Sequence, residues 1–444
     1  MAHARTRSAV VLGVQAHLIE VEADIGDGLP SMSIVGLPDT AVAESRQRVR
    51  AAIRNSGFSW PDRRVTISLS PASVHKRGSG LDIAIALAVL VAAGQVSNEL
   101  ARRAVLLGEL ALDGRVRSVK GVLAVALEAS ANSSPLLVVP EENAREAALV
   151  SDLTIAPVST LSDVLALFRG EPPKPLPKPA SKNVQRSTGT DLADVKGQEL
   201  ARLALEVCAA GAHHLSMTGP PGVGKTLLAS LLPTLLPDLN SPNSLRVTAT
   251  HSAAGVLAPG AGPITRPPLI SPHHTTSSNA LIGGGSSNVR VGLVSLADQG
   301  VLFLDETPEF RRECLDGLRQ PLEHGHVTVS RVGYHVVMPA KFQLCCAANQ
   351  CPCGPAVGKR CECTSAQRRR YFTRLSGPLL DRIDVRIGLS LPTKAEMKSP
   401  NGAEATEAVA KRVHLAREVA QLRLQGTGWQ TNGEVAGSYL RKHL

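Results

Sequence analysis

Hydrophobic and polar residues alternate in short runs along the first part of the chain, which is the pattern of half-buried β-strands. Residues 10–35 contain several such runs, among them His17-Leu-Ile-Glu-Val-Glu-Ala23. Residues 39–55 instead repeat apolar or small residues at helical spacing, and Gly57 is expected to end that helix. The continuous apolar run over residues 81–93 predicts a helix that is buried on every side.

Further elements complete one predicted domain of residues 1–170. Additional strands are expected at residues 64–69, 136–139 and 153–155. A hairpin is predicted over residues 104–116, because Asp113-Gly114 is a favoured two-residue turn. With a helix at residues 141–149, these strands predict an α+β domain.

Proline residues mark the clearest domain boundary. Glu171-Pro-Pro-Lys-Pro-Leu-Pro-Lys-Pro179 and the polar residues behind it predict an extended linker over residues 171–190. The next predicted domain, residues 191–388, opens with a helix that has an apolar face. The residues of that face are Leu200, Leu203, Ala204, Val207 and Cys208. Residues 389–444 predict an incomplete helical lid, with one amphipathic helix at residues 403–424.

A phosphate-binding loop organises the second region. It matches G-x-x-x-x-G-K-[ST] and consists of Gly219, Pro220, Pro221, Gly222, Val223, Gly224, Lys225 and Thr226. The glycines let backbone N–H groups curve around phosphates, Lys225 reaches the β and γ phosphates, and the Thr226 hydroxyl ligates Mg²⁺. A predicted strand at residues 214–218 and a predicted helix from Leu227 supply the context that this motif requires. The expected fold class is α/β, with a parallel sheet behind the loop.

Two acidic residues end a second buried strand, Val301-Leu-Phe-Leu-Asp-Glu306. Asp305 is expected to hold the Mg²⁺ shell, and Glu306 to polarise the water that attacks ATP. The alternative is an ordinary buried strand that ends in surface acids. The phosphate loop upstream argues against that alternative, since ligands bind at the carboxyl ends of parallel strands.

Two more polar residues complete the predicted catalytic set. Asn349 follows a buried strand at residues 342–348 and suits a sensor that orients the attacking water. Arg382 has two interpretations from the residues alone. It is either an arginine finger for the nucleotide of a neighbouring subunit, or one half of a surface salt bridge with Asp381 or Asp384.

Four cysteines form a tight cluster, Cys351, Cys353, Cys361 and Cys363. Two C-x-C pairs joined by a short loop can furnish four thiolates for a tetrahedral structural Zn²⁺. The spacing is tighter than the common C-x₂-C pair, so four reduced cysteines without metal are the alternative. A metal cluster, rather than a disulfide framework, is compatible with the cytoplasmic location that we expect.

The net charge of +10 favours an anionic partner besides ATP, and nucleic acid is the usual one. A solvated basic surface is the alternative interpretation. Only 2% of the residues are Phe, Trp or Tyr, so contacts with DNA would use Arg, Lys and backbone amides rather than stacking. The longest apolar run, residues 83–94, is too short to span a bilayer, and we expect no membrane partner.

Residues 70–82 and 108–121 resemble the Lon protease domain. That resemblance places the Ser–Lys dyad of Lon at Gly80 and near Val125 in this chain. Neither residue can perform the chemistry, because a nucleophile needs a hydroxyl group with a base beside it. The first domain is therefore expected to be a non-proteolytic scaffold.

Together the motifs resemble the magnesium-chelatase-like AAA+ family, and closely its ComM/YifB branch. Besides the phosphate loop and residues 301–306, the resemblance rests on Gly36-Leu-Pro-Asp39, Pro272-His-His-Thr275, Gly283-Gly-Gly285, Arg319-Gln-Pro-Leu-Glu323, Cys351-Pro-Cys-Gly354 and Ser376-Gly-Pro-Leu-Leu-Asp-Arg-Ile-Asp384. It implies ATP and Mg²⁺ as cofactors and a ring, a hexamer, with ATP sites between subunits. Members of the ComM branch act as DNA helicases that drive branch migration during uptake of transforming DNA.

The same resemblance implies two insertions that face the pore of the ring. One contains residues 280–290, and the other is a hairpin over residues 325–337. Arg290, Arg331 and Lys341 are the residues that it implies for DNA contact. Each of them can equally be a solvated surface charge.

Two departures from the family pattern keep other functions open. Gln350 stands where the family usually has proline, and the lid is short compared with AAA+ lids that continue for several helices. One alternative is a chelatase-type motor subunit that serves insertion of Mg²⁺ into a porphyrin. The other is a nucleotide-binding scaffold whose hydrolysis is impaired by the shortened C-terminus.

Overall fold

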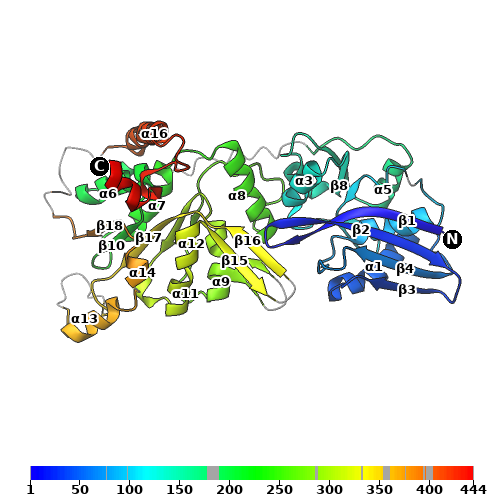
Figure 1. Ribbon diagram of the computed structural model, residues 1–444, viewed down its shortest axis with the longest axis horizontal. Coiled ribbons are helices and arrows are strands. Elements are labelled where there is room, and N and C mark those ends of the chain that lie inside the picture. Colours follow the sequence, from blue (N-terminus) through cyan, green and yellow to red (C-terminus); the bar gives the residue numbers. More distant parts are fainter. Residues whose placement is uncertain are drawn as a thin grey trace. The chain divides into compact units, whose positions relative to one another are not determined.

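The computed structural model describes residues 2–76, 78–97, 99–177, 190–285, 289–331, 334–353, 361–375, 377–393, 396 and 404–443. The chain forms two compact units (Figure 1). The first unit comprises Met1–Ser181, Leu245–Pro263 and Thr328–Val337. The second comprises Lys182–Ser244, Ile264–Val327 and Met338–Leu444.

A seven-stranded mixed sheet forms the centre of the first unit, in the order β3-β4-β2-β1-β5-β8-β9. Its strands are β1 (Ala2–Leu12), β2 (Gln15–Gly26), β3 (Ser31–Val35), β4 (Arg64–Ser70), β5 (Val105–Leu106), β8 (Leu136–Pro140) and β9 (Thr154–Val158). The pairs β1–β2 and β2–β4 are antiparallel, and the remaining pairs are parallel. The predicted hairpin around Asp113 is present as β6 (Glu109–Leu110) and β7 (Val116–Arg117), while β5 joins the main sheet.

The helices of this unit are α1 (Thr40–Asn55), α2 (Asp82–Ala92), α3 (Val122–Ala131), η1 (Glu141–Asn143), α4 (Ala144–Ala147) and α5 (Leu161–Phe168). Every residue of α2 is buried, as its apolar run predicts. Burial raises the pKa of the Asp82 carboxyl, and hydrogen bonds from Arg48 and Ser45 oppose that rise. The Arg48 Nε–Asp82 Oδ2 distance is 2.8 Å, so the buried carboxylate has a charged partner.

Residues 245–263 lie far along the sequence but pack into the first unit. They contain most of α8 (Ser241–Ala254), whose Ala249 joins the apolar cluster around α3. The Gly121 N–H donates to the Ser252 carbonyl at 3.2 Å, and the Ser252 hydroxyl donates to the Glu146 carboxylate. A short-range pattern cannot show this, because the partners of α8 are more than a hundred residues away.

The second unit contains a five-stranded parallel sheet, in the order β11-β14-β17-β10-β18. Its strands are β10 (Leu215–Thr218), β11 (Leu269–Ile270), β14 (Val301–Leu304), β17 (Gln343–Ala348) and β18 (Val385–Gly388). The predicted α/β fold with a parallel sheet behind the phosphate loop is confirmed. Because the strands are parallel, all their carboxyl ends meet at one edge of the sheet.

Helices and short turns surround that sheet. They are η2 (Leu192–Asp194), α6 (Glu199–Gly211), α7 (Lys225–Leu235), α9 (Ser278–Ile282), α10 (Leu293–Leu296), η3 (Thr307–Glu309), α11 (Arg312–Gly317), α12 (Arg319–His324), α13 (Ser365–Phe372), α14 (Gly377–Leu380), α16 (Thr406–Arg423), η4 (Asn432–Glu434) and α17 (Gly437–His443). One small hairpin, β12 (Gly283–Gly284) with β13 (Arg290–Val291), accompanies them. A second hairpin, β15 (His326–Arg331) with β16 (Tyr334–Pro339), begins and ends in this unit, but its segment Thr328–Val337 belongs to the first unit. None of the described helices is long and apolar enough to cross a membrane.

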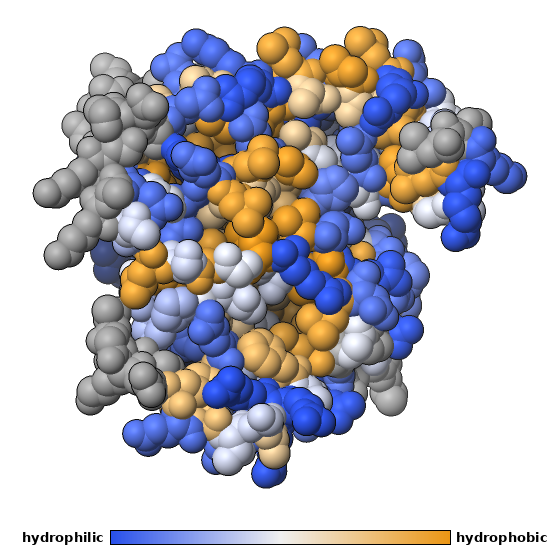
Figure 2. Space-filling model, turned by 90° about the vertical axis from the view of Figure 1, so that its left-hand side faces the viewer, coloured by the Kyte–Doolittle hydropathy of each residue, from blue (hydrophilic) through white to orange (hydrophobic). Residues whose placement is uncertain are grey.

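The apolar face predicted for α6 is only partly buried. Leu200, Leu203 and Val207 are exposed, whereas Ala204 and Cys208 are buried together with Ala201, Leu205 and Ala209. The buried face of α6 thus consists of small residues and Leu205, and the other large apolar residues lie on the exposed side. Figure 2 looks onto the side of the molecule where α6 lies in Figure 1, and it shows apolar groups at the surface among hydrophilic ones.

Candidate nucleotide-binding site

The phosphate loop joins β10 to α7, as the motif predicts. Gly222 and Gly224 have φ values of +75° and +93°, a left-handed conformation that favours glycine. Gly219 has no room for a side chain, since an added Cβ would lie 2.9 Å from the Leu389 carbonyl oxygen. The motif glycines are therefore required by the backbone path of the loop.

Lys225 is held inside this loop and is 8% exposed. Its Nζ donates to the carbonyl oxygens of Gly219 at 2.8 Å and Pro220 at 2.9 Å. It also donates to Asn349 Oδ1 at 3.0 Å, which brings the predicted sensor to the phosphate loop. Burial lowers the pKa of the Lys225 ammonium, and the Asp305 and Glu306 carboxylates oppose that change.

Strand register explains why Asn349 reaches Lys225. β10 and β17 are parallel neighbours in which Thr218 pairs with Ala348, so the loop and Asn349 begin at the same level of the sheet. Asp305 follows β14, the other neighbour of β17, and enters the same edge. The Thr226 hydroxyl donates to Asp305 Oδ2 at 2.8 Å. These two oxygen-bearing side chains fit the preference of Mg²⁺ for oxygen ligands, and they would hold the ion.

Glu306 adopts a left-handed backbone conformation with a φ of +49°. Its backbone N–H donates to Asp305 Oδ1 at 2.9 Å, and its side chain is half exposed. The Glu306 Oε2 atom lies 3.2 Å from His274 Nδ1. His274 is part of the Pro272-His-His-Thr275 motif, but its chemistry was not predicted from the sequence.

Arg382 lies at the opposite edge of the sheet from the phosphate loop of its own chain. It precedes β18, whose Val385 pairs with Leu215 at the amino end of β10, whereas the loop follows the carboxyl end of β10. Among the residues that the structure describes, Arg382 forms an ion pair with Glu323, at 2.8 Å between Nη2 and Oε1. The suggested partner Asp384 instead accepts from the His214 N–H at 3.2 Å.

Comparison with known proteins places this arrangement in a family. The family profile described as "Magnesium chelatase, subunit ChlI" matches residues 191–397, and "Subunit ChlI of Mg-chelatase" matches residues 21–143. An uncharacterized Mycobacterium tuberculosis protein is 48% identical over 442 residues, which cover 100% of this chain and 88% of that protein. The uncharacterized protein YifB of Escherichia coli is 42% identical, and the competence protein ComM of Haemophilus influenzae is 38% identical. Both of these alignments cover 93% of this chain and 81% of the relative.

The chain belongs to the magnesium-chelatase-like AAA+ family. Within that family, YifB and ComM are relatives over most of its length, which confirms the branch that the motifs indicate. Membership implies ATP and Mg²⁺ as ligands. The contacts of Lys225, Thr226 and Asp305 are compatible with both.

This AAA+ chain also brings its four clustered cysteines together. The Sγ atoms of Cys351, Cys353, Cys361 and Cys363 all lie within 4.8 Å of one another. Sulfur atoms on a tetrahedral Zn²⁺ with bonds of about 2.3 Å stand roughly 3.8 Å apart, so the cluster fits the ion. The observed separations include 3.2 Å for Cys351–Cys353 and 3.6 Å for Cys353–Cys361.

The cysteine cluster connects to the segment behind Glu306. Cys363 directly precedes Thr364, which caps α13 with a hydroxyl that accepts from the Gln367 N–H at 3.2 Å. Just beyond α13, Arg374 donates to Glu309 Oε2 at 2.8 Å and to the Pro308 carbonyl oxygen at 3.2 Å. Those two residues belong to η3, the turn that follows Glu306.

The three residues implied for DNA contact have different surroundings. Arg290 lies in β13 and is exposed. Arg331 ends β15, and its side chain lies outside the described part of the structure. Lys341 Nζ lies 2.9 Å from Glu434 Oε1, so its charge is already balanced by a carboxylate.

Proposed function

We propose that the chain is the ATP-hydrolysing subunit of a ring-shaped motor that acts on DNA. The observation that carries this proposal is the meeting of Lys225, Thr226, Asp305 and Asn349 at one edge of the sheet. In this proposal, residues 219–226 hold the phosphates, Thr226 and Asp305 hold Mg²⁺, Asn349 orients the attacking water, and Glu306 activates it. In this proposal the ATPase domain spans residues 191–388, although residues 245–263 and 328–337 of it belong to the first compact unit. It follows a scaffold of residues 1–170 and a linker of residues 171–190, and residues 389–444 form the lid.

The position of Arg382 supports an assembly of several copies. An arginine at the amino edge of the sheet cannot serve the nucleotide at the carboxyl edge of the same sheet. We infer that Arg382 completes the site of a neighbouring subunit, where its charge would stabilise the transition state. Glu323 would hold the guanidinium until that neighbour binds. A closed ring of six copies is the assembly that we propose, as the AAA+ resemblance implies.

DNA is the proposed partner of the motor, in the manner of a helicase or branch-migration factor that acts in DNA uptake or recombination. The net charge of +10 and the exposed Arg290 support an anionic partner. The relative from Haemophilus influenzae carries the name competence protein. Arg331 and Lys341 remain secondary candidates for DNA contact, Lys341 only if its ion pair with Glu434 opens.

The first prediction compares ATPase rates with and without DNA. We expect single-stranded or branched DNA to raise the rate severalfold, and the stimulation to weaken as salt is added, because contacts with phosphates release counterions. Arg290→Glu should reduce the stimulation, whereas the matched charge reversal Arg63→Glu in the first unit should keep it. Equal rates under all DNA conditions would contradict the proposed partner.

A chelatase-type motor subunit is the second candidate, because both matching family profiles carry a chelatase description. The same experiment separates the candidates. A chelatase motor would hydrolyse ATP at a rate that DNA does not change. A nucleotide-binding scaffold would bind ATP and hydrolyse none of it, with or without DNA.

We further propose that Cys351, Cys353, Cys361 and Cys363 hold one structural Zn²⁺. A closed four-sulfur site has no open coordination position, so its role would be to order the chain. Metal binding supplies folding free energy where few large apolar side chains are available. The hydrogen bonds from Arg374 to η3 would then connect the ordered segment to the turn that follows Glu306.

Metal analysis tests the zinc proposal. Protein purified without chelator should contain about one Zn²⁺ per chain, the stoichiometry of a four-ligand site. Cys361→Ser should lower the zinc content and reduce ATP hydrolysis more than ATP binding, because the cluster precedes α13 and Arg374, whose hydrogen bonds hold the turn that follows Glu306. Cys208→Ala is the control, since Cys208 is buried in α6 and burial raises its pKa to about 12. Normal ATP hydrolysis in protein that contains no zinc would contradict the proposal, and the four cysteines would then be packed thiols without a metal.

A further inference from the structure

Among the described residues, the Glu306 carboxylate has one ion-pair contact, and it comes from His274. The distance from His274 Nδ1 to Glu306 Oε2 is 3.2 Å. Both side chains are partly exposed, at 32% and 50%, so they lie at the surface of the nucleotide site rather than in the core. The contact leaves the Oε1 atom of the same carboxylate available to another partner.

The sheet brings these two residues together by register. β11 and β14 are parallel neighbours, and Ile270 pairs with Leu302. His274 follows Ile270, and Glu306 follows Leu302, by the same number of positions. The two segments therefore leave the carboxyl edge of the sheet at the same level. The pairing of the two strands therefore brings the segments that carry His274 and Glu306 to neighbouring positions at this edge of the sheet.

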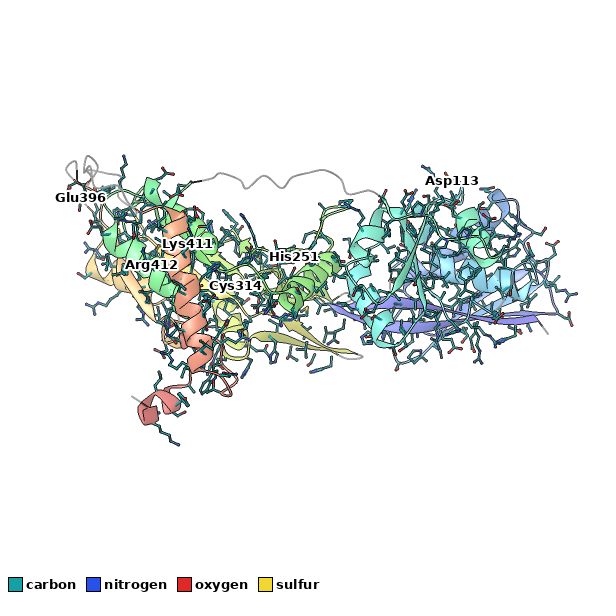
Figure 3. The ribbon with its side chains drawn as sticks, turned by 90° about the horizontal axis from the view of Figure 1, so that it is seen from above. Asp113, His251, Cys314, Glu396, Lys411 and Arg412 are labelled. Carbon is teal, nitrogen blue, oxygen red and sulfur yellow. The ribbon has the colours of Figure 1, made fainter. Side chains whose placement is uncertain are left out.

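The segment that carries His274 is itself held in place. The rings of His273 and His274 lie 4.2 Å apart, and His273 Nδ1 is 2.8 Å from the Thr275 hydroxyl. The thiol of Cys314, which is labelled in Figure 3, donates to the Thr276 carbonyl oxygen at 3.3 Å. Cys314 lies in α11, the first helix after η3, so one helix secures the His274 segment close behind the Glu306 turn.

We infer that His274 is a positioning residue for Glu306. A proton on Nδ1 is donated to Oε2, which fixes the carboxylate and directs Oε1 toward the attacking water. A base that is oriented by a third group is a recurring arrangement in catalytic sites. The left-handed backbone of Glu306 sets the direction of the side chain, and His274 sets its rotation. This inference rests on the ATP hydrolysis proposed above.

The test separates turnover from binding. His274→Ala should lower kcat for ATP hydrolysis about tenfold, a part of the 10²–10⁴-fold that a general base contributes, because Glu306 stays in place but loses the hydrogen bond that orients it. KM for ATP and the affinity for a non-hydrolysable ATP analogue should not change, because the contacts of Lys225 and Thr226 with their partners do not involve His274. Retained analogue binding also shows that the variant is folded.

A conservative variant identifies the atom that acts. The amide nitrogen of asparagine occupies nearly the place of histidine Nδ1, so His274→Asn should recover most of the lost kcat. His273→Ala removes the neighbouring ring but keeps the Nδ1 donor of His274, so it should lose less activity than His274→Ala. An equal loss in His273→Ala would indicate that the two rings act through packing.

Several outcomes would overturn the inference. One is a wild-type kcat in His274→Ala, and another is an equal loss in His274→Asn, which would indicate packing instead of donation. Wild-type protein without ATPase activity would overturn the proposed function and this inference together. Activity that depends on Glu306 but not on His274 would overturn the inference alone.

Discussion

Replacement of Lys225 by alanine should abolish ATP binding at concentrations that saturate the wild-type chain. The ammonium group is buried in the loop and donates three hydrogen bonds, to two loop carbonyls and Asn349. It is thus already placed where the β and γ phosphates would bind, and it can exchange these neutral acceptors for charged ones. Each hydrogen bond to a charged group contributes about 1.5–3 kcal/mol. Loss of the two hydrogen bonds from Lys225 to the β and γ phosphates should therefore weaken ATP binding by at least roughly a hundredfold.

Binding of labelled ATP is the measurement that checks this result. Lys411→Ala is the matched control, because Lys411 is 73% exposed on α16 and its ammonium pairs with Glu407 at 2.9 Å. Figure 3 labels Lys411 on that helix. The control should bind ATP as the wild type does. Undiminished binding by Lys225→Ala would remove the basis for assigning residues 219–226 to phosphate binding.

Much of this site could be predicted because its signals are local. The spaced glycines before Lys225 and the buried strand before Asp305 each indicate a function within about ten residues of sequence. Parallel strands then bring their carboxyl ends to one edge, so Asn349 could be assigned to the same site without knowledge of its partner. The contact between Lys225 and Asn349 agrees with that reasoning.

The remaining features depend on contacts between distant parts of the chain. The pairing of Arg382 with Glu323 and of Lys341 with Glu434 connects residues that no local pattern relates. His274 reaches Glu306 because of the register between β11, only two residues long, and β14. Strands this short leave almost no alternation in the sequence, so their pairing had to be seen in the structure.

Replacement of Glu306 by glutamine should keep ATP binding and stop turnover. The amide has nearly the shape of the carboxylate but cannot accept the proton of the attacking water, and general-base catalysis contributes about 10²–10⁴-fold to rates. The contacts of the phosphate loop do not include the Glu306 side chain, so ATP should still bind. An ATP-bound assembly should therefore accumulate.

Parallel measurements of ATP binding and hydrolysis show whether the variant lacks only the general base or has lost the nucleotide-binding site. Glu313→Gln is the matched control, because it makes the same substitution at an exposed residue of α11 and should hydrolyse ATP normally. A wild-type rate in Glu306→Gln would show that another group activates the water. Loss of binding together with hydrolysis would instead show that Glu306 supports the nucleotide site as a whole, since a residue that acts only on the attacking water changes kcat without changing the affinity for ATP.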